Sequence, residues 1–429
     1  MKLHRLFPLG MALLVTACGG TNVGTQGKAD TAGHRLSRDT DAVIAQAQAR
    51  LHASTTDSRA MDTLAGAYLQ KVREVGDPGY YPKVESLLTS ALRANPHDGQ
   101  AATLMGSLAL ARHQFHDAAR WGRQGSSELP SAASPLGVLV DAQTQLGDYQ
   151  SAVATCQQMV NLKPDLSSYA RVSYLRELNG DIPGAIDAMQ RAVEAGGPVP
   201  ENVAYTRTLL GTLYFNSGRI DEAASEYQQT LTEDPGYPAA LAGIGRVRAT
   251  QRRYAEAIDL YKKAVATYPL PDVVIALGDV YAVVGDSGSA GRTYDLARAE
   301  LKLYQANGVD LDAELALFEI DHGGDVNAAL AGAEQALADR PNVVVDDVVA
   351  WARFRAGNLQ GALVASRSAL RLGGRDALFY YHRGTIENAL GMRTEARHDL
   401  AAALSINPNF SLLHQAEAAR LLSSLGGAA

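Results

Sequence analysis

Two histidines in the first third of the chain have a spacing that metal sites use. His113 and His116 are three residues apart, and Asp117 follows directly. On a helix, side chains three positions apart lie on one face, where two imidazoles can share a metal ion. The segment 112–116, however, is expected to be the turn between two helices, and no further ligand is fixed by the sequence. We therefore interpret the pair as part of a solvated polar turn.

A second stretch offers nucleophilic chemistry. Gly285-Asp286-Ser287-Gly288 resembles the nucleophile segment of trypsin-like proteases. Such a serine acts only when a β-barrel places a histidine and an aspartate beside it, whereas the surrounding pattern is helical and aligns this stretch with the turn at residues 147–149. The sequence also lacks His-Glu-x-x-His, a cysteine pair at zinc spacing and a glycine cluster of the Rossmann type. We expect no enzyme, no metal and no cofactor.

Composition narrows the function classes further. The chain has 429 residues, 46% of them hydrophobic, and a formal net charge of −7. This balance argues against nucleic-acid binding, which needs a basic stripe to displace phosphate counterions. There are two cysteines, Cys18 and Cys156. Cys156 falls on an apolar helix face and is expected to be a small buried side chain, without a disulfide.

The elements that position these residues follow a fixed period in the sequence. Four kinds of position recur 34 residues apart, namely Gly211 and Gly245, Ala223 and Ala257, Tyr227 and Tyr261, and Pro235 and Pro269. Small residues let two antiparallel helices approach closely, tyrosines fill the space beside them, and proline ends the second helix. A period of this length predicts stacked helical hairpins. The pattern Leu210-Gly211-x-x-Tyr214, Ala223-x-x-x-Tyr227, Pro235 resembles the tetratricopeptide repeat family.

Weaker copies of the pattern extend over nearly the whole chain. We predict an all-α fold, an α-solenoid of about ten repeats over residues 39–425, with cap helices at 41–52 and 410–425. The copy at 277–294 lacks its closing proline, so its second helix is expected to continue to about Asn307 and to bend the solenoid.

The N-terminus reads as an export and anchoring signal. Residues 1–17 combine Lys2 and Arg5 with an apolar stretch that is too short to span a bilayer. Leu14-Val15-Thr16-Ala17-Cys18 resembles a bacterial lipobox, which implies cleavage before Cys18 and acylation of that cysteine. Residues 18–38 are rich in glycine and threonine and predict a flexible tether. The expected location is outside the cytoplasm, lipid-anchored to a membrane, which is the outer membrane facing the periplasm if the cell is Gram-negative.

The resemblance to tetratricopeptide repeats also implies where a partner would bind. In that family the first helix of each hairpin lines a concave groove. Carried over residue by residue, the groove positions in the first part are Asp141, Tyr174, Glu177, Tyr205, Thr208, Phe215, Asn216 and Arg246. In the second part they are Asp279, Glu314, Phe318, Asp321, Asp347, Trp351, Arg355, Tyr381 and Asn388.

One part of this predicted groove stands out by its side chains. Phe318, Trp351 and Tyr381 bring one large aromatic to each of three successive repeats, in a stretch that also carries Glu314 and two aspartates. Exposed aromatics are favoured anchors at protein interfaces, so one interpretation is an acidic groove with an aromatic floor that prefers basic peptides. The alternative is that these aromatics pack against the adjacent first helix where the superhelix tightens.

The function we expect from these patterns is a non-enzymatic scaffold that binds a protein or peptide partner and is anchored to the cell envelope by lipid. An accessory role in envelope assembly or polysaccharide export is a second hypothesis, by analogy of fold and location only. A small-ligand-binding or enzymatic envelope protein is a third.

Overall fold

The computed structural model describes residues 38–197 and 199–427. The predicted signal peptide at 1–17, Cys18 and the predicted tether up to residue 37 lie outside the described residues. The last predicted tether residue, Arg38, begins the first described helix.

The described part of the chain is all helical, as predicted. Helix α2 (Arg38–Ala53) comes first, and ten antiparallel pairs follow it. The first five pairs are α3 (Ser58–Val75) with α4 (Tyr81–Ala94), α5 (Gly99–Ala111) with α6 (Phe115–Glu128), α7 (Ser134–Gln145) with α8 (Tyr149–Leu162), α9 (Leu166–Leu178) with α10 (Ile182–Ala195), and α11 (Pro200–Asn216) with α12 (Ile220–Glu233). The other five are α13 (Pro238–Thr250) with α14 (Tyr254–Thr267), α15 (Pro271–Val283) with α16 (Ser287–Ala306), α17 (Asp312–Asp321) with α18 (Val326–Asp339), α19 (Val343–Arg355) with α20 (Leu359–Ala369), and α21 (Ala377–Ala389) with α22 (Arg393–Ile406).

Helix α23 (Gln415–Ser424) packs on α22 at the C-terminal end, and a short 3-10 helix, η1 (Pro78–Tyr80), fills the loop between α3 and α4. The C-terminal cap is therefore shorter than the expected 410–425. Helix α16 has 20 residues and its C-cap is Asn307, which confirms the predicted long second helix. In the described residues no helix is both long and apolar enough to cross a membrane.

The most regular repeat packs as its sequence predicts. The Tyr227 ring lies between α11, the first helix of its own pair, and α13, the first helix of the next pair. It is so close to both that a β-carbon added to Gly211 or to Gly243 would lie 2.6 Å from a ring atom. Ala223 and Tyr227 are buried, and Tyr227 Oη lies 3.1 Å from Thr212 Oγ1. Glycine is thus required here by close approach.

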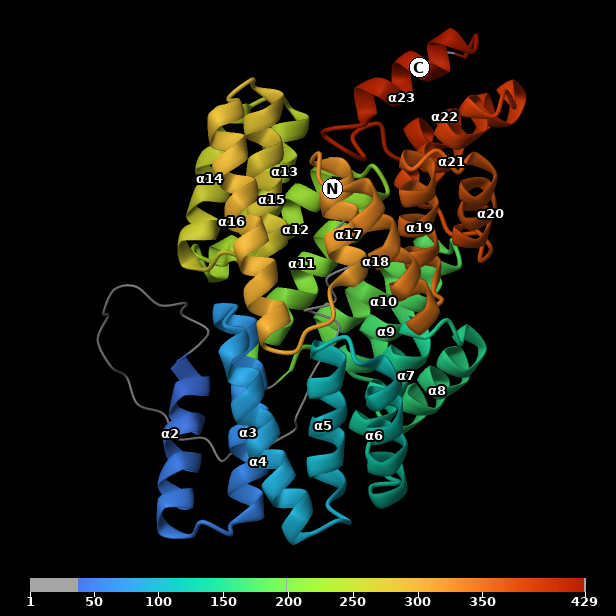
Figure 1. Ribbon diagram of the computed structural model, residues 1–429. Coiled ribbons are helices and arrows are strands. Elements are labelled where there is room, and N and C mark those ends of the chain that lie inside the picture. Colours follow the sequence, from blue (N-terminus) through green and yellow to red (C-terminus); the bar gives the residue numbers. More distant parts are fainter. Residues whose placement is uncertain (1–37, 198, 428–429) are drawn as a thin grey trace.

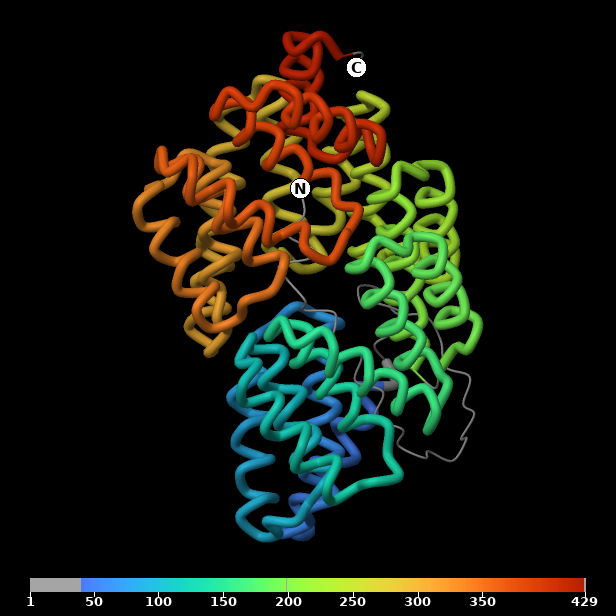
Figure 2. Tube along the Cα trace, turned by 90° about the vertical axis from the view of Figure 1, so that its right-hand side faces the viewer, coloured from blue at the N-terminus to red at the C-terminus, as the bar shows by residue number. Residues whose placement is uncertain are grey.

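The ten pairs wind into a superhelix whose later repeats stack on its earlier ones. We call these two levels the first and the second layer. Figures 1 and 2 show that α17 and α18 stand end-on above α5 and α6, and that α19 to α22 continue above the following helices. Asp310 N donates to Arg112 O at 2.9 Å, and Asn342 Nδ2 donates to Gln145 O at 2.8 Å across 197 residues. This separation is just under six 34-residue periods, so about six repeats complete one superhelical turn.

The two layers meet at five successive places. At each, the turn between two paired helices contacts a loop one superhelical turn later. The contacting pairs are Gly76 with Tyr268, His113 with Asp310, Gly147 with Pro341, Gly180 with Gly373, and Gly218 with Ile406. The second layer thus begins to contact the first at Tyr268, before α15, and the expected bend after α16 stays a prediction.

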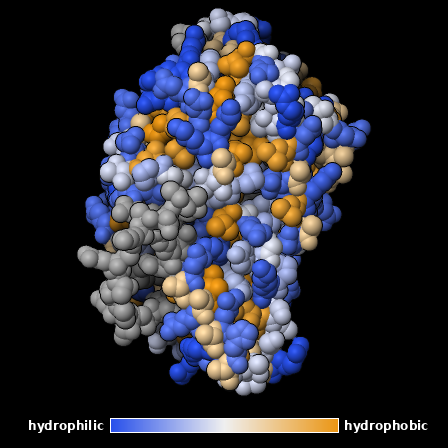
Figure 3. Space-filling model, turned by 90° about the vertical axis from the view of Figure 1, so that its left-hand side faces the viewer, coloured by the Kyte–Doolittle hydropathy of each residue, from blue (hydrophilic) through white to orange (hydrophobic). Residues whose placement is uncertain are grey.

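The outer surface is mixed in character. On the face drawn in Figure 3, apolar side chains lie in separate groups among hydrophilic ones. Exposed large hydrophobic residues on the α15–α16 pair and the turn between its helices include Val283, Val284, Leu296 and Leu303.

Candidate functional site

The structure brings the predicted aromatic residues of the C-terminal half together, and it buries them. Phe318, Trp351 and Tyr381 are 0%, 3% and 0% exposed. Trp351 stacks on His382 with ring centroids 4.2 Å apart, and Tyr381 lies 5.8 Å from Trp351 and 5.4 Å from Phe410. The expectation of an exposed aromatic floor is wrong, and the packing alternative is what the structure shows.

The acidic residues of this region have partners inside the protein as well. Asp321 accepts a hydrogen bond of 2.9 Å from Trp351 Nε1 and lies 3.5 Å from His414 Nε2. Burial would raise the pKa of Asp321, but His414, His382 and the Trp351 N–H outweigh it and hold the pKa far below its usual range. Tyr381 Oη donates to Glu417 at 2.9 Å.

Asp347 is a partner of His382 in the same network. Its two carboxylate oxygens lie 3.0 and 2.9 Å from His382 Nδ1, and both residues are buried. Glu314 lies elsewhere, at the layer junction, where it accepts 2.8 Å from Arg340 Nη2. The predicted acidic groove is therefore wrong for Glu314, Asp321 and Asp347. Their carboxylates are partners of groups inside a tight coil, whose inward side chains fill the space between successive first helices.

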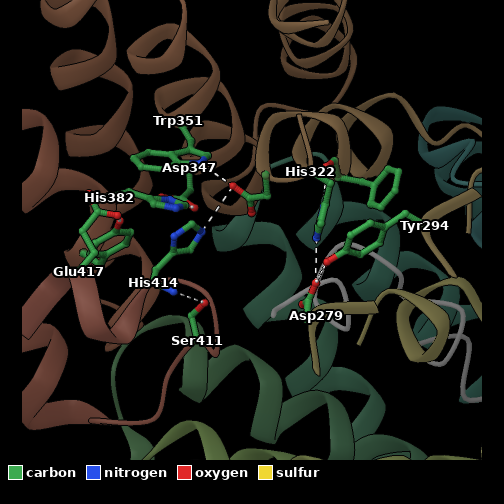
Figure 4. A network of polar contacts seen from close by, with 12 residues as sticks. Asp279, Tyr294, His322, Asp347, Trp351, His382, Ser411, His414 and Glu417 are labelled. Atoms are coloured by element: carbon green, nitrogen blue, oxygen red, sulfur yellow. Dashed lines mark hydrogen bonds and ion pairs between the residues drawn. The ribbon is translucent and has the colours of Figure 1, made fainter. Parts of the chain in front are cut away.

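Asp279 accepts two hydrogen bonds on one oxygen. Tyr294 Oη donates at 3.0 Å and His322 Nε2 at 2.9 Å, and Figure 4 shows both rings pointing at this carboxylate. His322 Nδ1 is 2.7 Å from the carbonyl oxygen of Phe318. Since each ring nitrogen faces an acceptor, both carry protons and His322 is an imidazolium. Burial lowers its pKa, and Asp279 with Phe318 O more than reverses this, so that the pKa is raised.

The other predicted groove residues are distributed along the interior. Phe215 is buried under the guanidinium of Arg246, 3.8 Å from its ring, and Asn216 Oδ1 is 3.5 Å from Arg246 Nη1. Arg73 lies over the Tyr205 ring at 4.8 Å. Thr208 is buried, Tyr174, Glu177 and Asn388 are half-buried, and Arg355 is exposed. Contact of these accessible side chains with a partner stays a prediction.

The histidine pair and the serine take structural positions. His113 is fully buried at the layer junction, where its Nδ1–H donates to Asp310 O at 2.7 Å. The interpretation as a solvated turn is thus wrong for His113, although His116 is exposed. Ser287 is the first residue of α16, and Asp286 caps that helix by accepting from Ser289 N. Cys156 is buried and free, and burial raises its pKa to about 11. In the described residues no group of three or more His, Cys, Asp or Glu is placed to hold a metal ion.

A groove of about 810 Å³ opens in the first layer, on first helices that the prediction largely passed over. We call it the N-terminal groove. Its walls come from α3, α5, α7 and α9, together with the loops before α5, α7 and α9, and residues lining it include Asp62, Asp98, Ser107, Lys163 and Arg171.

Of two buried aspartates that the structure describes in and beside the N-terminal groove, Asp141 is paired with a cation and Asp62 is not. Arg171 makes two hydrogen bonds to Asp141, of 2.9 and 2.6 Å, and donates to Gly137 O. Burial raises the pKa of Asp141 to about 6 even so, against the pull of Arg171. Asp62, on the opposite wall, has no such cation. Its burial, with the nearby charge of Asp98, raises its pKa to about 7.

Comparison with known proteins finds similarity to tetratricopeptide repeats. Residues 208–270 match the tetratricopeptide repeat family. Human Superkiller complex protein 3 is 23% identical over 327 residues, which are 71% of this chain and 20% of that protein. Human Tetratricopeptide repeat protein 21A is 25% identical over 243 residues, 51% of this chain and 18% of that one. This chain thus spans about a fifth of the length of these curated relatives.

Solved structures with a similar fold include the APC/C hetero-tetramer Cut9–Hcn1, at 14% identity and a TM-score of 0.38, covering 90% of this chain and 93% of that chain. Yeast Tom70 matches at 11% identity and a TM-score of 0.35, covering 91% and 96%.

Proposed function

We propose that this tetratricopeptide repeat chain is a non-enzymatic scaffold that binds an extended segment of a partner protein in the N-terminal groove and is held at a membrane of the bacterial envelope by lipid on Cys18. The observation that carries the binding proposal is the N-terminal groove itself, a hollow of about 810 Å³ along successive first helices. A segment of extended chain advances roughly 3.3 Å per residue, so several residues fit along four adjacent repeats.

The lining of the groove suits a main chain. Thr63, Gln100 and Ser134 line the groove and are half-buried, so their hydroxyl and amide groups can exchange hydrogen bonds with a peptide main chain. Leu162, which is 47% exposed, and the half-buried Ala132 supply apolar surface in the same lining. A polar groove with some apolar lining accords with binding that is specific but reversible.

Filling the groove tests the binding proposal. Thr63 and Gln100 line the groove and are half-buried, so Thr63→Trp with Gln100→Trp would occupy it. Arg93→Trp with Arg123→Trp places the same two side chains on exposed positions of α4 and α6 as a control. Proteins that co-purify with the wild type and with the control pair are expected to be lost from the groove-filled pair at an unchanged melting temperature. An identical set from all three would contradict the proposal.

The anchor rests on the sequence Leu14-Val15-Thr16-Ala17-Cys18. Two or three acyl chains on one cysteine give a stable membrane anchor, which a single chain does not. A tether of roughly 20 residues would give a reach on the order of 25 Å. Cys18→Ala is expected to abolish incorporation of labelled fatty acid and to release the protein from membranes. Label that persists in Cys18→Ala sinks the anchor proposal and leaves the groove untouched.

A further inference from the structure

Asp62 is a buried carboxylic acid without a hydrogen-bond partner in the part of the chain that the structure describes. It is 9% exposed, lines the N-terminal groove, and its Oδ1 has no hydrogen-bond partner among the described residues. Buried charged groups are normally paired, because an unpaired one keeps the full cost of its desolvation. Several other buried acids do have a cation at ion-pair distance, for example Asp141 with Arg171 and Glu314 with Arg340.

The charged groups around Asp62 do not supply a cation. Asp98 lines the same groove, and its Oδ1 caps α5 by accepting from Gln100 N and Ala101 N, while its Oδ2 has no hydrogen-bond donor among residues 38–197 and 199–427. Of the four cations that line the groove in the described part of the chain, three lie against other carboxylates and the fourth is Arg59. Arg50 pairs with Asp57 at 2.8 Å, Lys163 with Asp165 at 3.0 Å, and Arg171 with Asp141 at 2.6 Å. Arg59, one turn before Asp62 on α3, is exposed.

We infer that Asp62 and Asp98 together receive the side-chain cation of a lysine or arginine carried by the segment that binds in the N-terminal groove. This inference rests on the proposed function and adds the chemistry of the partner. A long basic side chain can lay its methylene stem on the apolar part of the groove lining while its charged end reaches the two carboxylates. The ion pair forms in a partly desolvated place, where charge complementarity selects strongly among partners.

A metal ion fits this place less well. Calcium takes six to eight oxygen ligands and magnesium near-octahedral coordination. Here one carboxylate oxygen of Asp98 is already used by two backbone N–H groups. A single ammonium or guanidinium needs only the two or three acceptors that Asp62 and Asp98 still offer.

Binding of a cation here is coupled to a proton. Burial, with the charge of Asp98, raises the pKa of Asp62 to about 7, so the acid is only partly ionised at neutral pH. The bound cation requires the ionised form, and below pH 7 binding must therefore release a proton. Affinity is expected to rise from pH 6 to pH 8.

The test is a selection of random 12-residue peptides on the immobilised full chain. The relevant peptides are those that the groove-filled variant, Thr63→Trp with Gln100→Trp, no longer retains. We expect them to be enriched in lysine or arginine at one position, and replacement of that residue by norleucine to weaken binding at least tenfold. Asp62→Asn is expected to weaken the basic peptide at least tenfold, to leave the norleucine peptide unaffected, and to remove the rise of affinity between pH 6 and pH 8.

Two controls separate this effect from damage to the fold. Asp98→Asn keeps the cap of α5, because asparagine is an equally good N-cap, and is expected to weaken the basic peptide as well. Asp165→Asn changes a carboxylate that also lines the groove but lies at the α9 end, and is expected to change affinity less than twofold.

The outcomes distinguish the two proposals. Groove-dependent peptides without a preferred basic residue, or with an affinity that Asp62→Asn does not change, overturn the inference and leave the proposed function standing. If no retained peptide depends on the groove, the proposed function fails and the inference fails with it.

Discussion

Asn342 joins the two layers of the superhelix while it caps a helix. Its Nδ2 donates to the carbonyl oxygen of Gln145 at 2.8 Å, and its Oδ1 accepts from Val344 N and Val345 N at the start of α19. The side chain is 3% exposed, so both ends of the amide act in a nearly dry junction.

The same arrangement recurs two repeats later. Asn407 Nδ2 donates to Phe215 O at 2.8 Å across 192 residues, and its Oδ1 accepts from Asn409 N. Each asparagine fixes its own loop with the oxygen and holds the earlier layer with the nitrogen. The rise of the coil is therefore set by amide hydrogen bonds and close backbone contacts at the junction, in addition to apolar packing between neighbouring repeats.

Replacing Asn342 by aspartate separates the helix cap from the hydrogen bond between the layers. The carboxylate of Asn342→Asp keeps the helix cap but loses the Nδ2 donor and faces the carbonyl of Gln145. We expect a loss of unfolding free energy of about 1–3 kcal/mol, the cost of an unsatisfied buried polar group, measured by urea denaturation.

Asn358→Asp is the matched control for this change. Asn358 caps α20 by accepting from Gly361 N at 3.0 Å and is exposed, so its substitution is expected to change stability by roughly 0.5 kcal/mol or less. Equal losses in the two variants would show that the bond between the layers contributes nothing.

Glycine at the junction turns is a second device that holds the layers together. Gly147 has φ +76°, and a β-carbon there would lie 2.5 Å from Pro341 O. Gly357 has φ +83° and no atom within 4 Å of the same position. Gly357→Ala is expected to cost only the left-handed conformation, about 1–2 kcal/mol. Gly147→Ala adds a backbone clash of roughly 1–3 kcal/mol. Melting temperatures that fall equally would contradict the close approach.

The repeats were predictable because their information is local. Small crossings such as Gly211, wedges such as Tyr227 and terminal prolines recur at a fixed period, and each acts on a neighbour in the same or the next hairpin. The closure of the coil was not predictable in this way. It depends on the angle between successive repeats, which no pattern within 34 residues encodes. This angle brings Gly147 against Pro341, 194 positions later in the sequence.

The site could be predicted only in part for the same reason. The first-helix positions of Asp279, Asp347, Trp351 and Tyr381 were identified correctly as inward-facing, but inward means buried in a coil this tight. Their histidine partners were missed, because His322 follows the end of α17 and His414 lies in the loop before α23. Asp62 offered no sequence signal that sets it apart from any other helical aspartate.

Trp351 is expected to matter for stability and not for binding in the N-terminal groove. Trp351→Phe keeps most of the stack on His382 but removes the Nε1–H that donates to Asp321. We expect a loss of about 1–3 kcal/mol in unfolding free energy. Trp121→Phe, at a half-buried position under Arg120, serves as the control and is expected to cost less. Loss of groove-dependent peptides from a folded Trp351→Phe protein would show that the C-terminal half takes part in recognition.

Two buried histidines are expected to give the stability opposite dependences on pH. Burial, with the charge of Arg340, lowers the pKa of His113 to about 3 from an unfolded value of 6.5. The unfolded chain therefore binds a proton that the folded chain refuses, and stability falls as the pH drops from 6.5 toward 3, by up to about 1.4 kcal/mol per pH unit. His322 has a raised pKa, so its contribution is complete below pH 6.5 and is lost as the pH rises through the folded value.

Two substitutions isolate these contributions. His113→Asn retains a side-chain N–H donor for Asp310 O and tolerates the positive φ of 59° at this position. It is expected to flatten the acid side of the curve of unfolding free energy against pH. His322→Gln removes the charge beside Asp279 and is expected to flatten the side above pH 6.5. Unfolding free energies of the wild type and both variants between pH 4 and pH 9 measure this. Parallel curves would mean that neither histidine changes its protonation on folding, and the imidazolium assigned to His322 from its two acceptors would then be wrong.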